Sequence, residues 1–291
     1  MTINKSLLKK ELNKEKLGSF YKTVGGGEGD RCYYPTRLDT YGKGCYYDCK
    51  YCYAKQLLDF RKLWNPNSPA TPSIKEIAKV IKSIPKGSVV RLGGMTDCFQ
   101  PIERIKRNTY KTIQLLNRKG VHYLIVTKSD LIIRNEYLEL MDNKLAHIQI
   151  SIPSTNNKIL QYTDNAKTYE TRAATVETLT DVGFDTQVRL APCLYNTIDF
   201  NKINAINCDK ILVEFLRVNS NAKKQLNEII NLNEYTVKEG GCRHLTLQKK
   251  MEILSKIHYK ELTVCEDVPK HYDYFTKYVN YNKNDCCNLT I

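Results

Sequence analysis

The hydrophobic pattern between about residues 36 and 220 alternates short β-rich runs with longer amphipathic stretches. Each apolar run is followed by a segment with helical periodicity. The six runs are TRLDTY, SVVRLGG, HYLIVTK, AHIQISI, DTQVRLAP and KILVEFL. Apolar strands that alternate with helices predict a parallel sheet that is buried on both faces. We therefore expect an α/β fold of strand–helix units, with the sheet either open or closed into a barrel.

This alternation stops at both ends of the chain. Residues 1–35 are rich in lysine and contain a glycine-rich run at 25–29. Without a strand before it, the glycine run predicts a flexible connector rather than a phosphate-binding loop. Residues 233–291 predict one amphipathic helix surrounded by cysteines. We interpret the chain as an N-terminal extension, a central α/β domain at 36–232 and a cysteine-bearing C-terminal extension.

The composition is that of a folded chain with an anionic partner. About 42% of the residues are apolar and 26% are charged, which is ordinary for a globular protein. The net charge of +14 favours nucleic acid, DNA or RNA, as the partner. No stretch approaches the ~18 apolar residues of a membrane span, and the N-terminus has no apolar signal core. We expect a cytoplasmic protein without a membrane partner, in which clustered cysteines indicate metal binding or catalysis.

Three cysteines stand close together directly after the first predicted strand. Cys45, Cys49 and Cys52 have C-x-x-x-C-x-x-C spacing in the segment GCYYDCKYC. A loop of this length can place three thiolates around one face of an iron–sulfur cubane. A structural zinc site needs a fourth ligand, and the segment lacks the second cysteine or histidine pair of such sites. Three ligands leave one iron open to bind a substrate or cofactor.

With Tyr51 as its aromatic residue, this motif resembles that of the radical S-adenosylmethionine (radical SAM) superfamily. The resemblance implies a 4Fe–4S cluster on Cys45, Cys49 and Cys52, with SAM bound to the open iron. It implies reductive cleavage of SAM to a 5′-deoxyadenosyl radical and an electron donor such as flavodoxin or ferredoxin. It also implies a partial (β/α)6 barrel of the TIM type, with the cofactor at the C-terminal rim.

The resemblance further implies that later strand ends contact SAM. Gly93 and Gly94 fit paired glycines that bring backbone carbonyls to the methionyl amine, because a side chain would block that approach. Lys128 can pair with the methionyl carboxylate, and the fork of Arg189 can bind a carboxylate through two hydrogen bonds. Two tyrosines are expected beside the adenine. The full set of expected SAM contacts is Tyr51, Tyr53, Gly93, Gly94, Thr96, Asp97, Lys128, Ser151 and Arg189.

The sequences at these strand ends narrow the resemblance. GCYYDCKYCYAK, MTDCFQP, IVTKSDLIIRN and HIQISIPS are together similar to the group related to spore photoproduct lyase, often described as DNA repair photolyase-like. In the lyase, a cysteine just before a Ser-Asp pair returns hydrogen to the product radical. In this chain Thr96 and Asp97 stand in the place of that pair, and Gly94 or Met95 occupies the place of the cysteine. The nearest thiol, Cys98, follows Asp97. Cys98 is therefore the candidate catalytic thiol, and cleavage of thymine lesions does not follow from the resemblance.

The C-terminal segment carries four further cysteines, Cys242, Cys265, Cys286 and Cys287. Their density favours a second iron–sulfur cluster, with His244 as a further candidate ligand because adjacent cysteines fit one cubane poorly. A zinc site, a thiol pair that donates hydrogen or electrons, and plain structural thiols are the other interpretations. Three more cysteines are expected to be plain buried thiols. These are Cys32, Cys193 and Cys208.

These patterns favour a radical SAM enzyme that abstracts hydrogen from a substrate, with nucleic acid as the first substrate class. Repair and base modification both fit the positive charge. A radical SAM enzyme that acts on a peptide or small metabolite is the enzymatic alternative. A non-catalytic iron–sulfur or zinc protein that binds nucleic acid is the alternative of another class, although it gives no reason for the polar strand ends.

Overall fold

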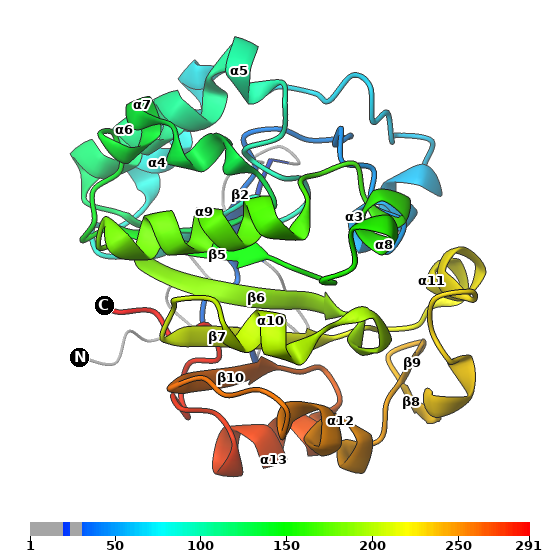
Figure 1. Ribbon diagram of the computed structural model, residues 1–291. Coiled ribbons are helices and arrows are strands. Elements are labelled where there is room, and N and C mark those ends of the chain that lie inside the picture. Colours follow the sequence, from blue (N-terminus) through cyan, green and yellow to red (C-terminus); the bar gives the residue numbers. More distant parts are fainter. Residues whose placement is uncertain (1–19, 24–30) are drawn as a thin grey trace.

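The computed structural model describes residues 20–23 and 31–291, which are coloured in Figure 1. The predicted connector at 25–29 and the lysine-rich start of the chain lie outside the described residues. In the described part, no helix combines the length and the apolar character needed to cross a membrane.

One eight-stranded sheet organises the fold. Its strand order is β1-β2-β3-β4-β5-β6-β7-β10, and all neighbours pair in parallel except β1 with β2. The strands are β1 (Tyr21–Thr23), β2 (Thr36–Leu38), β3 (Val89–Leu92), β4 (His122–Thr127), β5 (Ala146–Ser151), β6 (Asp185–Cys193), β7 (Lys210–Phe215) and β10 (Glu261–Cys265). Among the described residues β1 and β10 form the two edges and do not pair, so the barrel is partial. The predicted α/β class is confirmed.

The C-terminal segment contributes a strand that the hydrophobic pattern does not predict. β10 pairs in parallel with β7, from Glu261 opposite Lys210 to Cys265 opposite Glu214. Part of the expected extension therefore belongs to the sheet, which has seven parallel strands instead of the six predicted. The sequence ELTVC is short and only partly buried, so it lacks the continuous apolar run of a central parallel strand.

Helices cover the outer face of the sheet. Figure 1 shows α4, α6, α7 and α9 along one side of the strands and α12 and α13 beside β10. The helices are α3 (Tyr53–Asp59), α4 (Ile74–Ser83), α5 (Glu103–Lys106), α6 (Asn108–Lys119), α7 (Asn135–Leu138), α8 (Asn157–Thr163), α9 (Tyr169–Asp181), α10 (Phe200–Asn204), α11 (Ser220–Leu226), α12 (Leu247–Leu254) and α13 (Pro269–Tyr278). In α4, Ser73 and Glu76 form a capping box, and Ile77, Val80 and Ile81 are buried against the sheet. A hairpin of β8 (Val237–Glu239) and β9 (Cys242–His244) precedes α12.

The two faces of the sheet are packed differently, because side chains alternate along each strand. Residues such as Ile148 and Val188 point outward and belong to the main hydrophobic core. The opposite face, here called the inner face, carries a smaller apolar cluster that includes Val89, Leu124, Val126, Leu212 and Cys265. Further toward the strand ends, the inner positions are polar and include Arg91, Gln149, Arg189 and Glu214. The inner face is therefore a partly charged surface.

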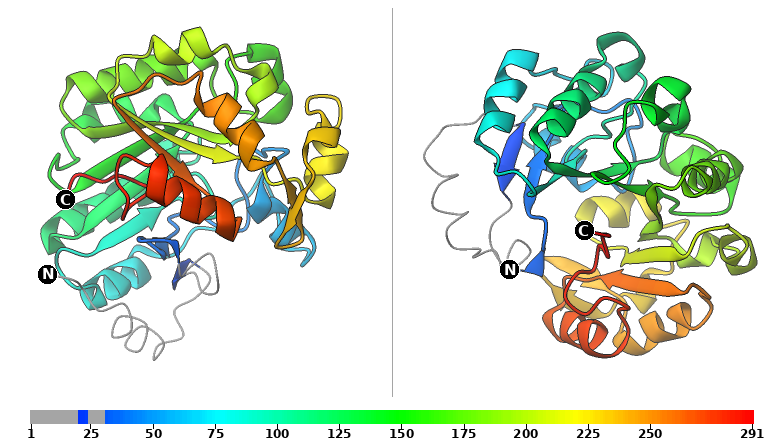
Figure 2. Two further views of the ribbon diagram at one scale, coloured as in Figure 1. Left: turned by 90° about the horizontal axis from the view of Figure 1, so that it is seen from below. Right: turned by 90° about the vertical axis from the view of Figure 1, so that its left-hand side faces the viewer.

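The segment 281–291 lies on the inner face. In the right-hand view of Figure 2, it leaves α13 and enters the space that the strands surround. Within the segment, Asp285 accepts hydrogen bonds from Tyr34 Oη and from the Cys287 N–H, both at 2.8 Å, and from the Leu289 N–H at 3.0 Å. One carboxylate thus fixes the turn that places Cys287 against the strands.

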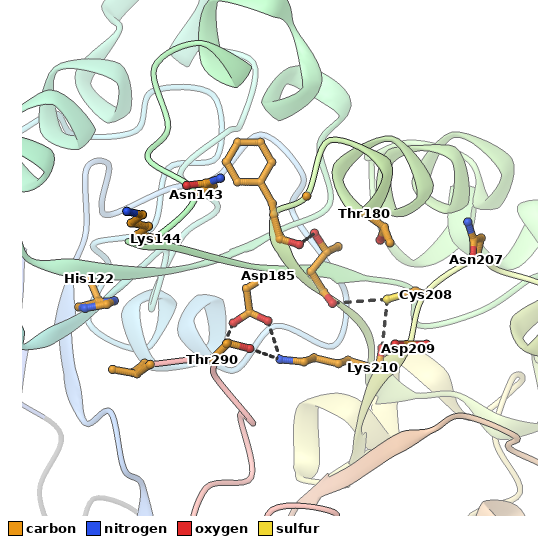
Figure 3. A pocket seen from close by; sticks show the side chains of 14 residues that line it. His122, Asn143, Lys144, Thr180, Asp185, Asn207, Cys208, Asp209, Lys210 and Thr290 are labelled. Atoms are coloured by element: carbon orange, nitrogen blue, oxygen red, sulfur yellow. Dashed lines mark hydrogen bonds and ion pairs between the residues drawn. The ribbon is translucent and has the colours of Figure 1, made fainter.

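A second set of polar contacts, here called the Asp185 clamp, holds the other end of the segment. It lies where β6 and β7 begin, on the wall of an open hollow (Figure 3). Lys210 Nζ donates to Asp185 Oδ1 at 2.6 Å and to the Asn288 carbonyl at 3.0 Å. The Thr290 N–H donates to Asp185 Oδ2 at 2.9 Å. The segment is therefore tied to the strands at both of its ends.

The Asp185 clamp predicts a pH-dependent contribution to stability. Burial alone would raise the pKa of Asp185, but hydrogen bonds from His147, Lys210 and the Thr290 N–H lower it to about 2. A lowered folded-state pKa stabilises the protein above the unfolded pKa, and the stabilisation is lost as the pH falls from about 4 to about 2. We expect Asp185→Asn to lower the free energy of unfolding at pH 7 by about 2 kcal/mol, measured by urea titration.

The difference between Asp185→Asn and the unaltered protein should shrink as the pH approaches about 3. Asp209→Asn is the control, because Asp209 is 67% exposed and its pair with Lys260 lies in solvent. An Asp185→Asn effect of unchanged size at low pH would contradict the assignment.

Candidate functional site

The predicted cluster cysteines lie in the loop between β2 and α3, at the C-terminal edge of the parallel strands. In Figure 1, α3 lies on the same side of the sheet as α8 and α11. Cys45, Cys49 and Cys52 belong to one small apolar cluster with Tyr47. Cys52 is also the N-cap of α3, and its Sγ accepts from the Lys55 N–H at 3.4 Å. The structure therefore brings the three cysteines together.

Polar contacts hold this cysteine loop in shape. Asp48, at φ 39°, accepts from Lys55 Nζ at 2.8 Å and from Trp64 Nε1 at 3.0 Å. Gly44 packs directly on the backbone of Asn65, where a Cβ would lie 1.9 Å from the carbonyl oxygen. Only glycine fits at this position. The spacing of the cysteines is thus set within a tightly packed loop.

The surroundings of the three sulfurs suit a bound iron–sulfur cluster. Backbone N–H groups of Asp97 and Tyr47 lie near the Cys45 sulfur and oppose the rise of its pKa. Burial raises the pKa of Cys45 to about 12 and raises the pKa values of Cys49 and Cys52 as well. Iron would supply the missing positive charge and deprotonate the thiols, and the N–H donors would stabilise the resulting thiolates. The residues present therefore fit such a group.

The paired glycines at the end of β3 are packed so closely that side chains would collide. Gly93 has a φ of 79°, and a Cβ there would lie 3.2 Å from the Val126 carbonyl oxygen. A Cβ on Gly94 would lie 2.6 Å from Arg37 Cδ. The Gly94 carbonyl accepts a hydrogen bond from Tyr53 Oη, which joins α3 to the end of β3. Both glycines thus let the end of β3 pack closely against its neighbours.

Thr96 and Asp97 join neighbouring strand ends to one another. Thr96 Oγ1 donates to the Tyr41 carbonyl at 2.7 Å. Asp97 accepts from Thr127 Oγ1 at 2.7 Å and from the Lys128 N–H at 2.8 Å. These two expected SAM contacts therefore have partners within the protein, and they hold the loops after β3 and β4 in place.

The Lys128 ammonium group lies beside the cysteine loop. Its Nζ is 5.8 Å from the centre of the Tyr51 ring. Burial would lower the pKa of Lys128, but Cys49, Asp164 and Asp97 raise it above its ordinary value. Lys128 is therefore a cation that can bind an anionic group of a ligand at this edge.

A buried ion pair behind Tyr51 is absent from the sequence predictions. Arg172 on α9 pairs with Asp164 at 2.6 Å, and both side chains are fully buried. Tyr51 Oη donates to the second Asp164 oxygen at 2.7 Å, and Arg172 donates to the Ser151 carbonyl at 3.1 Å. The pair thus fixes Tyr51 and the end of β5. The one available signal is that Arg172 lies in helical phase with the buried Val176.

Arginines gather on the inner face near the strand ends. Arg189 donates to Gln149 Oε1 at 2.6 Å and to Glu214, so its fork is already engaged. Arg217 pairs with the same Glu214 at 3.2 Å, and Arg91 lies close enough for Glu214 to act on its charge. Arg217 also pairs with Asp267, so three arginines meet two carboxylates here, and the excess positive charge suits an anionic ligand.

Two expected site residues lie away from the cysteine loop or make internal contacts. Cys98 is fully buried in the main core, where burial raises its pKa well above the ordinary value. The structure therefore does not bring this thiol to the loop. Ser151 Oγ donates to the Ala191 carbonyl at 2.8 Å, so the hydroxyl joins β5 to β6.

The structure divides the cysteines of the C-terminal segment. Cys265, Cys286 and Cys287 share the inner-face cluster. Cys242 lies apart from them on β9, near the charges of Arg217 and Asp267. Cys32, expected to be a plain thiol, lies near Cys265 and Cys287. Within the described ranges, no three His, Cys, Asp or Glu side chains, Cys45, Cys49 and Cys52 included, form a group that could hold a single metal ion. A cubane does not require its cysteines to meet at one point, because each binds a different iron.

A family model described as the Radical SAM superfamily matches residues 40–204, more than half of the chain. The matched region begins just before the cysteine loop and includes β3 to β6. It therefore contains the cysteine loop and the site residues from Gly93 to Arg189.

An uncharacterized protein of Methanocaldococcus jannaschii is 26% identical to this chain over 167 residues. The aligned part is 55% of this chain and 61% of the relative, so the chain spans less than two thirds of the relative's length.

Solved structures of spore photoproduct lyase share the fold. One, complexed with dinucleoside spore photoproduct, has a TM-score of 0.60 at 14% identity and covers 90% of this chain and 78% of the other. A mutant with bound AdoMet and the same dinucleoside has a TM-score of 0.59 at 13% identity, with the same coverage. At this identity the likeness concerns the fold, and it agrees with the partial barrel.

The Arg172–Asp164 pair should be a large contributor to stability around the site. We expect Arg172→Met to lower the free energy of unfolding by about 3–5 kcal/mol, because Asp164 is left as a buried charge with no cation. The double variant with Asp164→Asn should recover part of this loss. Arg118→Met, at an exposed position on α6, is the control and should change stability by less than about 0.5 kcal/mol. The free energies of unfolding are measured by urea titration. A loss in Arg172→Met no larger than the loss in Arg118→Met would contradict the role of the pair.

Proposed function

This chain belongs to the radical SAM superfamily and is a radical SAM enzyme, and on that premise we propose that it abstracts hydrogen from a nucleic acid, for repair or base modification. The observation that carries the proposal is the packed cysteine loop at the strand ends, with the Lys128 cation beside it and arginines on the inner face below. The loop suits radical generation, and the positive surface suits an anionic substrate.

Cys45, Cys49 and Cys52 would each hold one iron of a 4Fe–4S cluster. When bound, the cluster supplies the electron that cleaves SAM to methionine and a 5′-deoxyadenosyl radical. The protein's own part is to hold the loop through Asp48 and Gly44 and to exclude water from the sulfurs by burial.

The residues around the loop divide into those that face a ligand and those that hold the strand ends. Lys128 provides a point charge for the methionyl carboxylate, and the glycine backbone at the end of β3 would lie beside the methionyl amine. Tyr53, which is 56% exposed, presents its ring for the adenine. Asp97 and Arg189 act through neighbouring residues, because their polar atoms are engaged within the protein.

Two observations support nucleic acid as the substrate class. The chain has a net charge of +14, and the inner face places Arg91, Arg189 and Arg217 around Glu214. The spore photoproduct lyase structures with the same fold contain a dinucleoside. An electron donor of the flavodoxin or ferredoxin class completes the proposed reaction.

Loss of one loop cysteine should abolish the cluster. After anaerobic reconstitution of the full chain, we expect about four iron and four sulfide per chain and formation of 5′-deoxyadenosine with SAM and dithionite. Cys49→Ala should lose both, because two thiolates cannot hold the cubane. Cys208→Ala, whose thiol contacts backbone carbonyls on β6 and β7, should retain both. Undiminished iron in Cys49→Ala would overturn the ligand assignment.

The substrate class is tested by adding candidate substrates to the cleavage assay. We expect DNA or RNA to raise the rate of 5′-deoxyadenosine formation, and rising salt to weaken this effect because phosphate contacts release counterions. Peptides and small metabolites from a fractionated extract form the comparison. Acceleration by a phosphate-free fraction alone would replace nucleic acid by the enzymatic alternative. Salt-dependent binding of DNA without any 5′-deoxyadenosine would indicate a binding protein instead.

A further inference from the structure

Three thiols form a group on the inner face, separate from the cysteine loop. Cys265 ends β10, and Cys286 and Cys287 follow α13 in the segment that enters this face (Figure 2). All three are free and pack around Leu124 and Leu212. Cys286 is within hydrogen-bonding reach of both Cys265 and Cys287. We call these three residues the inner thiol group.

The segment that carries the group is fixed in place by polar contacts. Asp285 binds the N–H groups of Cys287 and Leu289, as described above. Asn288 has a φ of 49° and donates through Nδ2 to Glu261 at 2.7 Å, next to the start of β10. A left-handed residue and a multiply bonded carboxylate define one conformation of the backbone. The sulfurs are therefore held in position relative to the strands.

The three thiols do not have equivalent surroundings. The neighbouring Cys286 thiol, and after it the nearby cations Arg189 and Arg91, lower the pKa of Cys287. Hydrogen bonds to its two sulfur neighbours raise the pKa of Cys286 well above the ordinary value. Of the two adjacent cysteines, Cys286 is therefore the one that keeps its hydrogen.

Two side chains, those of Arg91 and Tyr53, lie between the inner thiol group and the cysteine loop. Arg91 lies near Cys287 and also near Tyr53. Tyr53 in turn lies near Cys52 and binds the Gly94 carbonyl. A radical that forms beside the loop would thus be separated from the thiols by the side chains of Tyr53 and Arg91, which border the inner face.

We propose that Cys286, supported by Cys265 and Cys287, is the hydrogen-atom donor that quenches a carbon radical on the inner face. The proposal rests on the proposed function, which supplies that radical. The S–H bond of Cys286 breaks homolytically and a C–H bond forms, which is favourable because an S–H bond is weaker than most C–H bonds. One electron from the flavodoxin or ferredoxin-class donor and one proton from water then convert the Cys286 thiyl radical back to the thiol.

The inner thiol group would then take the role for which the family resemblance made Cys98 the candidate. Cys98 is fully buried in the main core, on the other side of β3 from the inner face. Cys286 packs against the inner-face cluster and is partly exposed. Cys242, on β9 and outside the inner-face cluster, offers a control thiol from the C-terminal extension.

The test follows hydrogen in heavy water. The reconstituted full chain is incubated with SAM and dithionite in deuterated buffer, without substrate, and the deuterium at the 5′ carbon of 5′-deoxyadenosine is measured by mass spectrometry. Thiol hydrogens exchange with solvent, so we expect one deuterium from Cys286. Cys286→Ala and Cys286→Ser should both lose the label while keeping about four iron per chain. Cys242→Ala should retain it.

The possible outcomes separate this proposal from the proposed function. If no 5′-deoxyadenosine forms in the unaltered chain, the proposed function fails. If 5′-deoxyadenosine forms but carries no label, or if Cys286→Ala keeps the label, the hydrogen-donor role fails and the radical chemistry stands.

A second measurement does not depend on activity. Mild oxidation of the cluster-free protein with diamide should give a disulfide that joins Cys286 to Cys265 or Cys287, identified by peptide mass spectrometry. If Cys286 remains a free thiol under conditions that oxidise exposed thiols, the three sulfurs are not within mutual reach and the proposal is overturned. Iron or zinc bound by the inner thiol group in a chain without the three loop cysteines would also overturn it.

Discussion

Parallel pairing of the strands is the constraint on which the site depends. Because parallel neighbours run in the same direction, every strand from β2 to β7, and β10, ends at one edge of the sheet. Cys45, Gly94, Lys128 and Ser151 are far apart in the chain and meet because each follows or ends one of these strands. The residues after the strands are then free to take irregular conformations, since the hydrogen bonds of the sheet already hold their starting points.

The buried charges near the strand ends serve geometry as much as binding. Asp164 orients Tyr51 and Arg172, and Asp97 ties the loop after β3 to Lys128. A carboxylate that accepts several hydrogen bonds defines the positions of all its donors at once. The site thus combines a layer of fixed polar side chains with a small number of groups that remain available to a ligand.

The sequence predicts the parts that depend on local pattern. Continuous apolar runs identify β2 to β7, and the spacing of Cys45, Cys49 and Cys52 identifies the loop. The pairing of β10, the ion pair of Arg172 and the approach of Cys32 to the inner face depend on contacts between distant residues, which periodicity does not encode. Thr96 and Asp97 show an intermediate case, because their place at a strand end is predictable but the direction of their side chains is not.

The pairing register of the sheet also has a consequence for the order of folding. Strands β3 to β7 pair across short separations, as between Tyr123 and Ala146, 23 positions apart, or His147 and Asp185, 38 apart. Two further parallel pairs are more distant: Arg37 pairs with Arg91, 54 positions away, and Lys210 with Glu261, 51 away. Because closing longer loops costs more entropy, the central strands should assemble first. The cysteine loop and the inner thiol group would then be added from opposite ends of the chain onto a sheet that has already formed.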